Sequence, residues 1–469
     1  MPTKFIDIPI IKVGGQQVST EFMDDLDELV VDSSLYLPGM FAIRLNDPTY
    51  KWVDDASLDI GKEVEISIKT GEGDDGSSTE GQLIKGEITA QEASFPGAGM
   101  PTMTIRGYDK AHRLHRGKKT RTFLKVKDSD LASKLAGEAG LSADVDSTTP
   151  TYDFVLQNNQ TNMEFLQARA ERIGYQVWAS EGKLHFKKGD ATLGDGPELV
   201  HGENLLSFQP CWTTVGQADK MIVRGWDPKG KQAIESLKSP SSSLNQGGMT
   251  QTGGAKASSS FSSAESVTTD RPVFTSDEAG ELATGLSNDI SRDYVQAEGV
   301  CDGNPKVLAG YKITIKGVGT RFSGKYLVTS ATHVYNVSGY ETRFSISGRQ
   351  PNTLSHLLDS GNGHGERVEG VVTALVTNVG DPDDLGRVKV KYPWLGKNQG
   401  AEIESDWVRI ASPMAGAQRG FLYLPEVNDE VLLAFEHGDV HHPYIVGALW
   451  SNTDKPPKKN SEADRRAHV

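Results

Sequence analysis

Apolar and polar residues alternate along most of the first 120 residues. The segments FAIRLND, EVEISIKT, QLIKGEITAQEA and PTMTIRGYD share this alternation, and turn-rich stretches separate them. A period of two is typical of strands that bury one face. The segment Gly71–Gly81 lacks the Gly-Lys-Ser/Thr ending of a phosphate-binding loop, and no helical pattern follows it. We expect a flexible hairpin loop there, within a first β-barrel over residues 1–120.

The period becomes helical between residues 121 and 200. Apolar residues at helical spacing predict a first helix, through Leu131, Leu135 and Ala139. Asp128 or Ser129 is expected to cap this helix, and Gly140 to end it. A second helix is expected in NMEFLQARAERIGY, with Asn162 as its cap and Gly174 as its end.

A hairpin follows the second helix. The runs YQVWAS and LHFKK flank Glu181 and Gly182, which suit a tight turn. Residues 121–200 are therefore predicted to form a small α/β insertion between stretches of barrel-like strands.

Strands resume over residues 201–350. The tract 239–266 is rich in Ser, Gly and Thr, so we expect a mobile loop there. A helix is predicted over residues 276–293, capped by Thr275 or Ser276, because apolar residues recur on one of its faces. No strand–helix alternation of a parallel sheet appears. The predicted fold class is therefore mainly β, with two antiparallel barrels and small helical insertions.

The last part of the chain contains closely spaced strand patterns. After a linker at 351–369, the runs are GVVTALVTNV, GRVKVKYPW, DWVRIASP, GFLYLP, DEVLLAFEHG and HPYIVGALW. Turn residues lie at Asp381–Asp384, Val427–Asp429 and Gly438–Asp439. So many short strands in so few residues predict a small OB-fold barrel over 370–452. A polar tail at 453–469 follows.

This part of the chain resembles a known family. The strings VTNVGDPDDLGRVKVKYPW, DWVRIASPMAG and GFLYLPEVNDEVLLAFEHGDVHHPYIVGALW are similar to the OB domain at the base of contractile-tail spikes. NNQTNMEFLQARAERIGYQVW and YETRFSISGRQP resemble parts of the preceding hub. The chain is thus identified as similar to the VgrG-type spike/hub proteins of contractile injection systems. The positions that carry the OB resemblance are Gly370, Asp381, Gly386, Arg387, Val388, Trp407, Arg409, Pro425, Asp429, Gly438, Asp439, Pro443 and Gly447.

The resemblance implies a structural protein rather than an enzyme, with no cofactor. It implies a homotrimer whose paired barrels make a pseudo-sixfold ring for a hexameric inner tube. Its other implied partners are baseplate proteins and a tip-cap protein or cargo effector, and it would contact a target membrane only on firing. It would be synthesised in the cytoplasm and become part of a phage-like particle. A phage, a type VI secretion system and an extracellular injection system remain alternatives.

One departure from the family concerns the needle. Relatives usually continue well beyond the OB domain, whereas only SNTDKPPKKNSEADRRAHV follows Trp450 here. Either the needle is missing from this chain or another protein supplies the point.

Composition and net charge limit the classes of partner that the protein is expected to bind. The formal net charge of −14 argues against nucleic acid as a main partner, because phosphate binding needs clustered Lys and Arg. No segment approaches the roughly 18 apolar residues of a membrane helix, and no secretory signal is evident at the start. Cys211 and Cys301 lie far apart in no metal-like spacing, and are interpreted as incidental buried thiols of a reducing compartment.

The segment EHGDVHHP raises the possibility of a metal site. It places His437, His441 and His442 beside Glu436 and Asp439. If His441 and His442 both lie in a strand they point to opposite faces, so we expect a solvated structural turn and no metal.

Two further hypotheses concern carboxylates and aromatics. Two carboxylate pairs, Glu402 with Glu404 and Asp383 with Asp384, suggest glycoside hydrolysis. Both pairs lie in hydrophilic loop sequence, however, where both carboxylates are expected to stay ionised. Tyr392, Trp394 and Trp407 could stack on single-stranded nucleic acid, but acidic residues surround them, so core or trimer contacts are expected. A cell-wall hydrolase and an OB-fold binding module stay as alternatives to the structural role.

Overall fold

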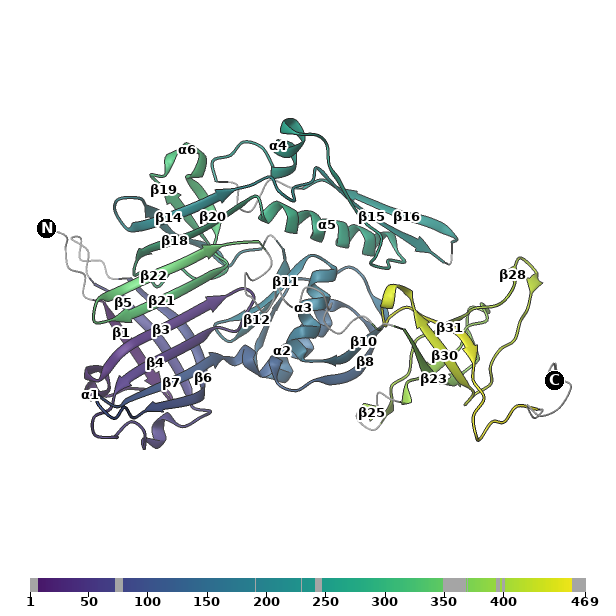
Figure 1. The fold of residues 1–469 in the computed structure, drawn as a ribbon, viewed down its shortest axis with the longest axis horizontal. Coiled ribbons are helices and arrows are strands. Elements are labelled where there is room, and N and C mark those ends of the chain that lie inside the picture. The colour runs from purple at the N-terminus through teal and green to yellow at the C-terminus, as the bar shows by residue number, and fades with distance from the viewer. Residues whose placement is uncertain are drawn as a thin grey trace.

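The structure is a computed structural model with two parts. It describes residues 7–71, 79–189, 191–228, 230–240, 247–348, 368, 370–393, 397–398 and 401–457. Residues 7–348 form an N-terminal body, and residues 370–457 form a C-terminal barrel at one end of the long axis (Figure 1). Strands predominate in both parts, so the predicted mainly-β class is confirmed. Most of the expected linker at 351–369, most of the loop between Gly71 and Gly81 and the end of the tail lie outside the described residues.

Strands from both predicted barrels pair side by side in one large sheet. In spatial order its strands are β14 (Leu205–Trp212), β18 (Val295–Asp302), β22 (Gly339–Ile346), β21 (Ser330–Asn336), β3 (Leu26–Ser34), β4 (Met40–Asn46), β7 (Thr102–Asp109), β6 (Thr79–Ser94), β5 (Glu63–Thr70), β1 (Ile8–Val13) and β2 (Gln16–Gln17). Antiparallel pairing of β3 with β21 makes the seam between an early and a late segment of the chain. The two predicted barrels are therefore two lobes that share a sheet.

Each lobe has a separate hydrophobic core. Phe41, Ile66 and Ile105 lie in the core of the first lobe. The second lobe has its own core, to which β19 (Tyr311–Lys316) and β20 (Gly324–Leu327) contribute. Strand β13 (Gly194–Val200) pairs in parallel with β19. Residues 194–200 therefore lie with the second lobe, which differs from the predicted end of the insertion at residue 200.

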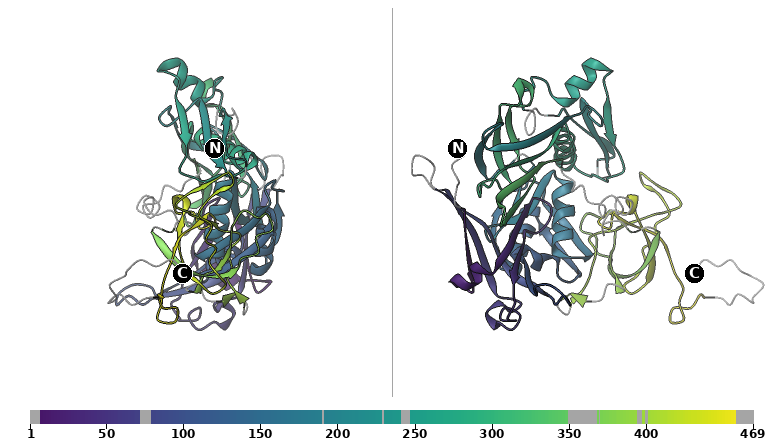
Figure 2. Two further views of the ribbon diagram at one scale, coloured as in Figure 1. Left: turned by 90° about the vertical axis from the view of Figure 1, so that its right-hand side faces the viewer. Right: turned by 60° about the vertical axis from the view of Figure 1, so that its left-hand side comes forward.

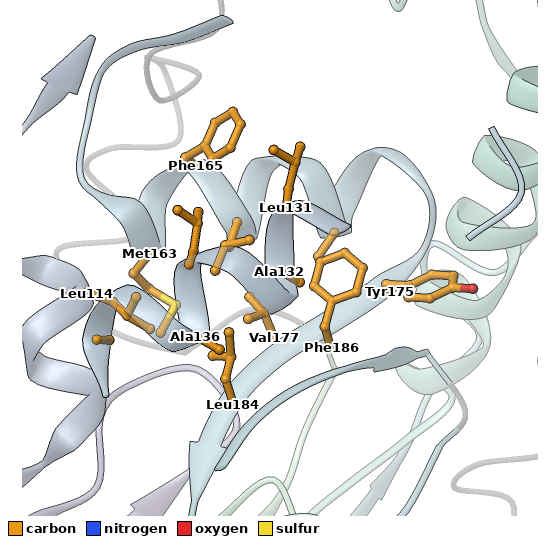
Figure 3. Packing of buried hydrophobic residues seen from close by; sticks show 14 of the residues in the cluster. Leu114, Leu131, Ala132, Ala136, Met163, Phe165, Tyr175, Val177, Leu184 and Phe186 are labelled. Atoms are coloured by element: carbon orange, nitrogen blue, oxygen red, sulfur yellow. The ribbon is translucent and has the colours of Figure 1, made fainter. Parts of the chain in front are cut away.

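The α/β insertion is built around two helices. Its elements are β8 (Lys119–Val126), α2 (Asp128–Ala139), β9 (Ser142–Val145), β10 (Tyr152–Gln160), α3 (Asn162–Arg172), β11 (Tyr175–Ser180) and β12 (Lys183–Lys188). Figure 3 shows Leu131 and Ala136 of α2 packed with Phe165 of α3 and Phe186 of β12. The apolar residues that predicted these helices are thus the ones that they bury. The hairpin turn at Glu181 and Gly182 has the left-handed backbone that a type I′ turn requires.

The helix ends agree with the prediction, but two of the helix starts do not. Gly140 and Gly174 end their helices with φ of 74° and 70°. Lys127, not Asp128 or Ser129, precedes α2, because the Asp128 carboxylate turns inward to a buried ion pair. Thr161, not Asn162, caps α3. Its hydroxyl accepts from the N–H of Glu164 at 3.1 Å, whereas Asn162 is buried and its amide oxygen accepts from other side chains.

The tract predicted as a mobile loop contains regular structure. Helix α4 (Gly253–Ser260) lies within it and strand β17 (Glu265–Thr268) begins in it, and β17 pairs in parallel with β15 (Lys220–Asp227). An added Cβ on Gly254 would lie 2.3 Å from the carbonyl oxygen of Ala218. The prediction of a loop there was wrong, because glycines order this segment by close backbone packing, which needs few apolar side chains. Residues 241–246 lie outside the described part of the chain.

Helix α5 (Ser276–Arg292) covers the small sheet made by β15, β16 (Gln232–Lys238) and β17. Thr275, one of the two predicted caps, is the residue that caps it. The remaining helices within the described residues are short: α1 (Thr20–Asp24), α6 (Gly319–Phe322) and the 3-10 segments at Ala56–Leu58, Lys110–His115 and Glu436–Gly438. Figures 1 and 2 place α5 between this outlying sheet and the α/β insertion.

A glycine-to-glycine contact joins α5 to the insertion. An added Cβ on Gly285 would lie 2.4 Å from the Cα of Gly174, a backbone atom that cannot rotate away. The substitution Gly285→Ala is therefore expected to destabilise the protein by about 1–3 kcal/mol in chemical denaturation, in spite of the better helix propensity of alanine.

Gly280 provides the matched control for this prediction. It lies in the same helix, and an added Cβ there meets only the hydroxyl of Ser236, at 4.0 Å. Gly280→Ala should leave stability unchanged or raise it by up to about 1 kcal/mol. Equal effects of the two substitutions would mean that the close contact does not hold α5 in place.

The two cysteines are free, and they differ in exposure. Cys301 is buried, and burial raises the pKa of its thiol to about 12. Cys211 is exposed, so its interpretation as a buried thiol was wrong. Strands β14 and β18 pair with each other, but the register places Cys211 opposite Gln296 and Cys301 opposite Leu205.

Candidate functional site: the joint between the N-terminal body and the C-terminal barrel

The C-terminal barrel is a closed five-stranded sheet. Its strands in spatial order are β24 (Lys389–Lys391), β23 (Val371–Asn378), β30 (Glu430–Phe435), β31 (Pro443–Ala448) and β27 (Arg409–Ile410). An isolated bridge between Val388 and Val408, the residues directly before β24 and β27, brings the first and last of these strands together. This closure leaves little free edge and agrees with the predicted OB-type barrel.

One predicted strand of the barrel is absent. The segment Phe421–Leu424 forms no strand, and its four side chains are exposed by 43–76%. It follows a two-residue hairpin of β28 (Ala415–Gly416) and β29 (Arg419–Gly420). The prediction of a strand for GFLYLP was therefore wrong.

Neither Tyr392 nor Trp407 is an exposed ring on which a nucleic-acid base could stack. Tyr392 lies in the barrel core and is 1% exposed. Trp407 is half-buried beneath Lys389, whose Nζ lies 5.5 Å from a ring centroid. The core position expected for these aromatics is therefore found for Tyr392, while Trp394 lies outside the described residues.

Strand β10 of the insertion packs into the barrel. Phe154 and Leu156, on one face of this strand, join the hydrophobic core of the barrel. Val155, on the opposite face, joins the core of the insertion and is fully buried. Because alternate residues of a strand point to opposite faces, β10 is shared by two cores. It therefore connects the N-terminal body to the C-terminal barrel over an apolar surface.

Asp439 is the polar centre of this joint. One of its carboxylate oxygens lies 3.0 Å from a guanidinium nitrogen of Arg172, at the end of α3. His441 contacts the other oxygen through its N–H at 3.0 Å and its Nδ1 at 2.8 Å. His442 Nδ1 lies 3.1 Å from the oxygen that Arg172 contacts. A barrel carboxylate therefore binds a cation of the N-terminal body and two histidines of its own turn.

His441 links Asp439 to strand β10. The backbone N–H of Leu156 donates to its Nε2 at 3.1 Å, so Nδ1 carries the proton that is donated to Asp439. His442 packs edge-on against Phe274 of the N-terminal body, with ring centroids 4.0 Å apart. Both histidines thus approach the body from the same turn.

The histidine turn differs from the prediction. His441 and His442 precede β31 and converge on one carboxylate, so the argument that they point to opposite faces was wrong. The turn is also buried at Asp439 rather than solvated. His437 stands apart in a left-handed conformation, with φ of 50°. Within the ranges that the structure describes, no group of three or more His, Cys, Asp or Glu side chains could hold a metal ion.

The electrostatics of the joint favour its charged form. Burial opposes the negative charge of Asp439, but His441 and Arg172 and the hydrogen bonds from both histidines outweigh it, so its pKa is well below 3.8. Burial likewise opposes the positive charge of Arg172. The attraction of the Asp439 carboxylate outweighs this effect of burial, so the pKa of the guanidinium is raised. Each charge is therefore stable only because the other is present.

Acid is expected to weaken this joint below about pH 4. Because the folded pKa of Asp439 is lowered, its stabilisation is complete above the unfolded value of 3.8 and is lost as pH falls through the folded pKa. Unfolding temperatures measured from pH 6 to pH 3 should fall more steeply for the wild type than for Asp439→Asn. Parallel curves would show that Asp439 does not couple stability to pH.

A second carboxylate organises the turn after β23. Asp381 accepts hydrogen bonds from the backbone N–H groups of Asp383, Leu385 and Arg387 and binds the Arg387 guanidinium, at 2.6 Å for the shortest contact. The pKa of Asp381 is strongly lowered. The hydrogen bond from the Arg387 guanidinium is the largest cause, and the backbone hydrogen bonds contribute less. Asp383 also binds the Arg387 guanidinium, at 2.7 Å, and therefore belongs to an ion-paired turn.

The other motif residues occupy structural positions around the barrel. Gly370, Gly386 and Gly438 have positive φ angles, and an added side chain would be strained at each. Val388 bridges the sheet closure, and Arg409 lies over the ring of Tyr444. Exposed or half-buried positions without a further contact in this joint are Pro425, Asp429, Pro443 and Gly447. Of the thirteen positions, Asp439 lies at the polar centre of the joint and Val388 lies in the barrel core that Phe154 and Leu156 join, and the roles of the others stay predictions.

Sequence analysis missed the partners that the N-terminal body contributes. Arg172 looks like an ordinary basic residue in the last turn of a helix. Phe154, Val155 and Leu156 form a short run without alternation, which is the pattern of a strand buried on both faces. That run was the available signal for a strand shared by two cores.

Family models match most of the chain. The model described as the Alg8 N-terminal domain matches residues 44–336. The model described as the type VI secretion system/phage-baseplate injector OB domain matches residues 372–450. The second match covers the barrel that contains Asp439, and the first covers strand β10 and Arg172. The joint is therefore built between two matched regions.

Two spike-related proteins are similar in sequence to parts of this chain. The actin cross-linking toxin VgrG1 of Vibrio cholerae is 40% identical over 75 residues, which are 16% of this chain and 7% of the relative. The type VI secretion system spike protein VgrG1b of Pseudomonas aeruginosa is 22% identical over 374 residues, covering 73% of this chain and 48% of the relative. The alignments span less than half of either relative.

A solved structure shares the overall fold. The E. coli c3393 protein, described as a component of the type VI secretion system with structural similarity to the T4 bacteriophage tail proteins gp27 and gp5, superposes with a TM-score of 0.55. The sequences are 12% identical, and the superposition covers 94% of this chain and 99% of that one. At this identity the likeness shows the arrangement of the lobes, the insertion and the barrel, and no more.

Proposed function

Because this chain belongs to the VgrG-type spike proteins and, over residues 44–336, to the family of the Alg8 N-terminal domain, we propose that it joins an inner tube to a piercing tip as a homotrimer. The N-terminal body is then the hub, and the C-terminal barrel is the base of the spike. The joint at Asp439 and β10 is the observation that carries this proposal. A subunit that transmits force needs an apolar and ion-paired connection between its parts, and the two cores share β10.

The shared sheet supports the proposed match to a hexameric tube. On one side of the β3–β21 seam the strands follow as β3, β4, β7 and β6, and on the other as β21, β22, β18 and β14. Each series begins with a hairpin and continues with antiparallel neighbours. Two similar lobes per chain give six quasi-equivalent lobes in a ring of three chains.

The remaining partners are proposed from the same role. Baseplate proteins would surround the hub, and a tip-cap protein or cargo effector would follow the barrel. The subunit would be made in the cytoplasm and then become part of a phage-like particle, contacting a target membrane only on firing. None of the helices in the described ranges is long and apolar enough to cross a membrane.

An exposed apolar strip on the barrel is the proposed contact between copies. The strip is Phe421–Leu424, and its middle residues Leu422 and Tyr423 are 76% and 60% exposed. Four consecutive exposed apolar residues of this kind are unusual on a monomeric protein and are typical of an interface. In the proposed trimer, the barrels of three chains would bury these strips against one another.

The strip provides a test of the proposed function. Leu422→Asp should convert the trimer into monomers at micromolar concentration, because a charge at an apolar interface loses its hydration. Sedimentation velocity measures the mass directly. Val337→Asp is the control, since Val337 is 92% exposed at the β21–β22 turn and lies outside the strip. A wild-type chain that sediments as a monomer would contradict the proposal.

A further inference from the structure

Three side chains on one face of the insertion sheet form a Ser–His–Asp chain. The sheet order β11, β12, β9 places Ser180, His185 and Asp144 on three successive strands. Ser180 Oγ lies 2.8 Å from His185 Nε2, and His185 Nδ1 lies 2.8 Å from Asp144 Oδ2. These contacts are the ones by which a general base activates a serine and an acid orients that base.

The histidine of this chain is held in one orientation. Its side chain is 4% exposed, and its ring stacks on Trp178 with centroids 4.9 Å apart and an angle of 20° between the planes. With Nδ1–H donated to Asp144, Nε2 is free to accept the hydroxyl proton of Ser180. Burial lowers the pKa of His185 although Asp144 opposes this, so the imidazole is uncharged at neutral pH.

Ser180 also lines a small cavity to which the insertion and both lobes contribute residues. The cavity has a volume of about 50 Å³, and its lining includes Ser180, Trp178, Ser33, Ile84 and Lys85. One water needs about 10–15 Å³ of such space, so a short acyl group fits and a large substrate does not. The cavity therefore sets the size of any group that the serine could receive.

We propose that Ser180, His185 and Asp144 form an acyl-transfer site for short-chain esters, separate from the structural role of the chain. Ser180 Oγ forms a bond to the carbonyl carbon, and its proton passes to His185 Nε2. The ester C–O bond breaks, and the leaving alkoxide takes that proton. Water then attacks the acyl-serine with His185 again as the base, which releases the acid and restores Ser180. Asp144 is a positioning residue in this scheme.

The surroundings of Asp144 predict a slow site. Its side chain is 39% exposed and also contacts Lys187, at 2.5 Å. Water and the lysine both reduce the stabilisation that Asp144 gives to a protonated His185. We therefore expect the acylated serine to accumulate and to be easier to detect than sustained turnover.

Covalent labelling of the full chain tests the proposal. The probes are a fluorophosphonate and p-nitrophenyl acetate, and mass spectrometry of peptides locates the modified residue. We expect labelling at Ser180, no label there in Ser180→Ala, and at least a tenfold slower rate in His185→Gln. Ser142→Ala is the control, because Ser142 is an exposed serine on the same strand as Asp144. Labelling of Ser180 no faster than that of Ser142 would overturn the proposal.

A second measurement distinguishes activation from a merely structural network. The labelling rate of the wild type should rise with pH as His185 loses its proton, and Asp144→Asn should lower the rate and move that profile. A pH profile that is the same in Asp144→Asn as in the wild type would also overturn the proposal. Sedimentation of each variant reports the oligomeric state separately, so a failure here leaves the proposed function untouched.

Discussion

Replacing Asp439 by alanine is expected to destabilise the joint by about 2–4 kcal/mol, because it leaves a largely buried guanidinium without its counter-ion. The side chains of Arg172 and Asp439 are 15% and 9% exposed, so water cannot replace the lost contact fully. The substitution also removes the acceptor that orients His441, whose Nε2 accepts from the N–H of Leu156. The loss should therefore spread to strand β10.

Hydrogen exchange at β10 measures this effect where it is expected. The amide of Leu156 should exchange faster in Asp439→Ala, together with its neighbours in the strand. Glu426→Ala is the matched control, since Glu426 is an exposed acid of the same barrel. If β10 exchanges equally in both variants, Asp439 does not hold the barrel to the N-terminal body.

Arg169→Met is expected to have the largest effect on stability, a loss of about 3–5 kcal/mol, because it leaves a buried carboxylate unpaired. Arg169 Nε lies 2.6 Å from Asp128 Oδ1, and the two side chains are 1% and 0% exposed. The guanidinium also covers the ring of Tyr152, with 4.3 Å to its centroid. This ion pair links α2 to α3 beneath the joint, so the insertion should unfold first.

The double variant Asp128→Ala with Arg169→Met separates charge from packing. Removing both charges should recover most of the lost stability, since apolar replacements of buried pairs are often close to neutral. Arg224→Ala breaks an exposed pair with Glu235 and should have no measurable effect on unfolding by denaturant. A double variant as unstable as Arg169→Met alone would show that packing, not charge, is what the arginine supplies.

Sequence patterns predicted the elements that bury one face. Helices α2, α3 and α5 were predicted from apolar residues that now lie in cores, and the hairpin at Glu181 from its turn residues. The C-terminal barrel was predicted from strand spacing and from the resemblance of its turns. Each of these signals is local, since the residues that carry it lie within one or two neighbouring elements.

The features that were missed depend on contacts between distant parts of the chain. Arg172 and Asp439 are 267 residues apart, and nothing near either of them indicates the other. Asp128 looked like a helix cap because the buried partner that turns it inward is Arg169, on another helix. Phe421–Leu424 looked like a strand because apolar residues suit a sheet as well as an interface. Helix α4 was missed because glycine packing leaves no apolar pattern.

Single-particle imaging of the purified chain tests the central claim most directly. The proposed function predicts a three-fold particle with six similar lobes in a ring at one end and three C-terminal barrels gathered on the axis at the other. Each barrel should keep its contact with β10 of its own chain. A monomer at micromolar concentration, or a ring whose barrels take no fixed position, would contradict it.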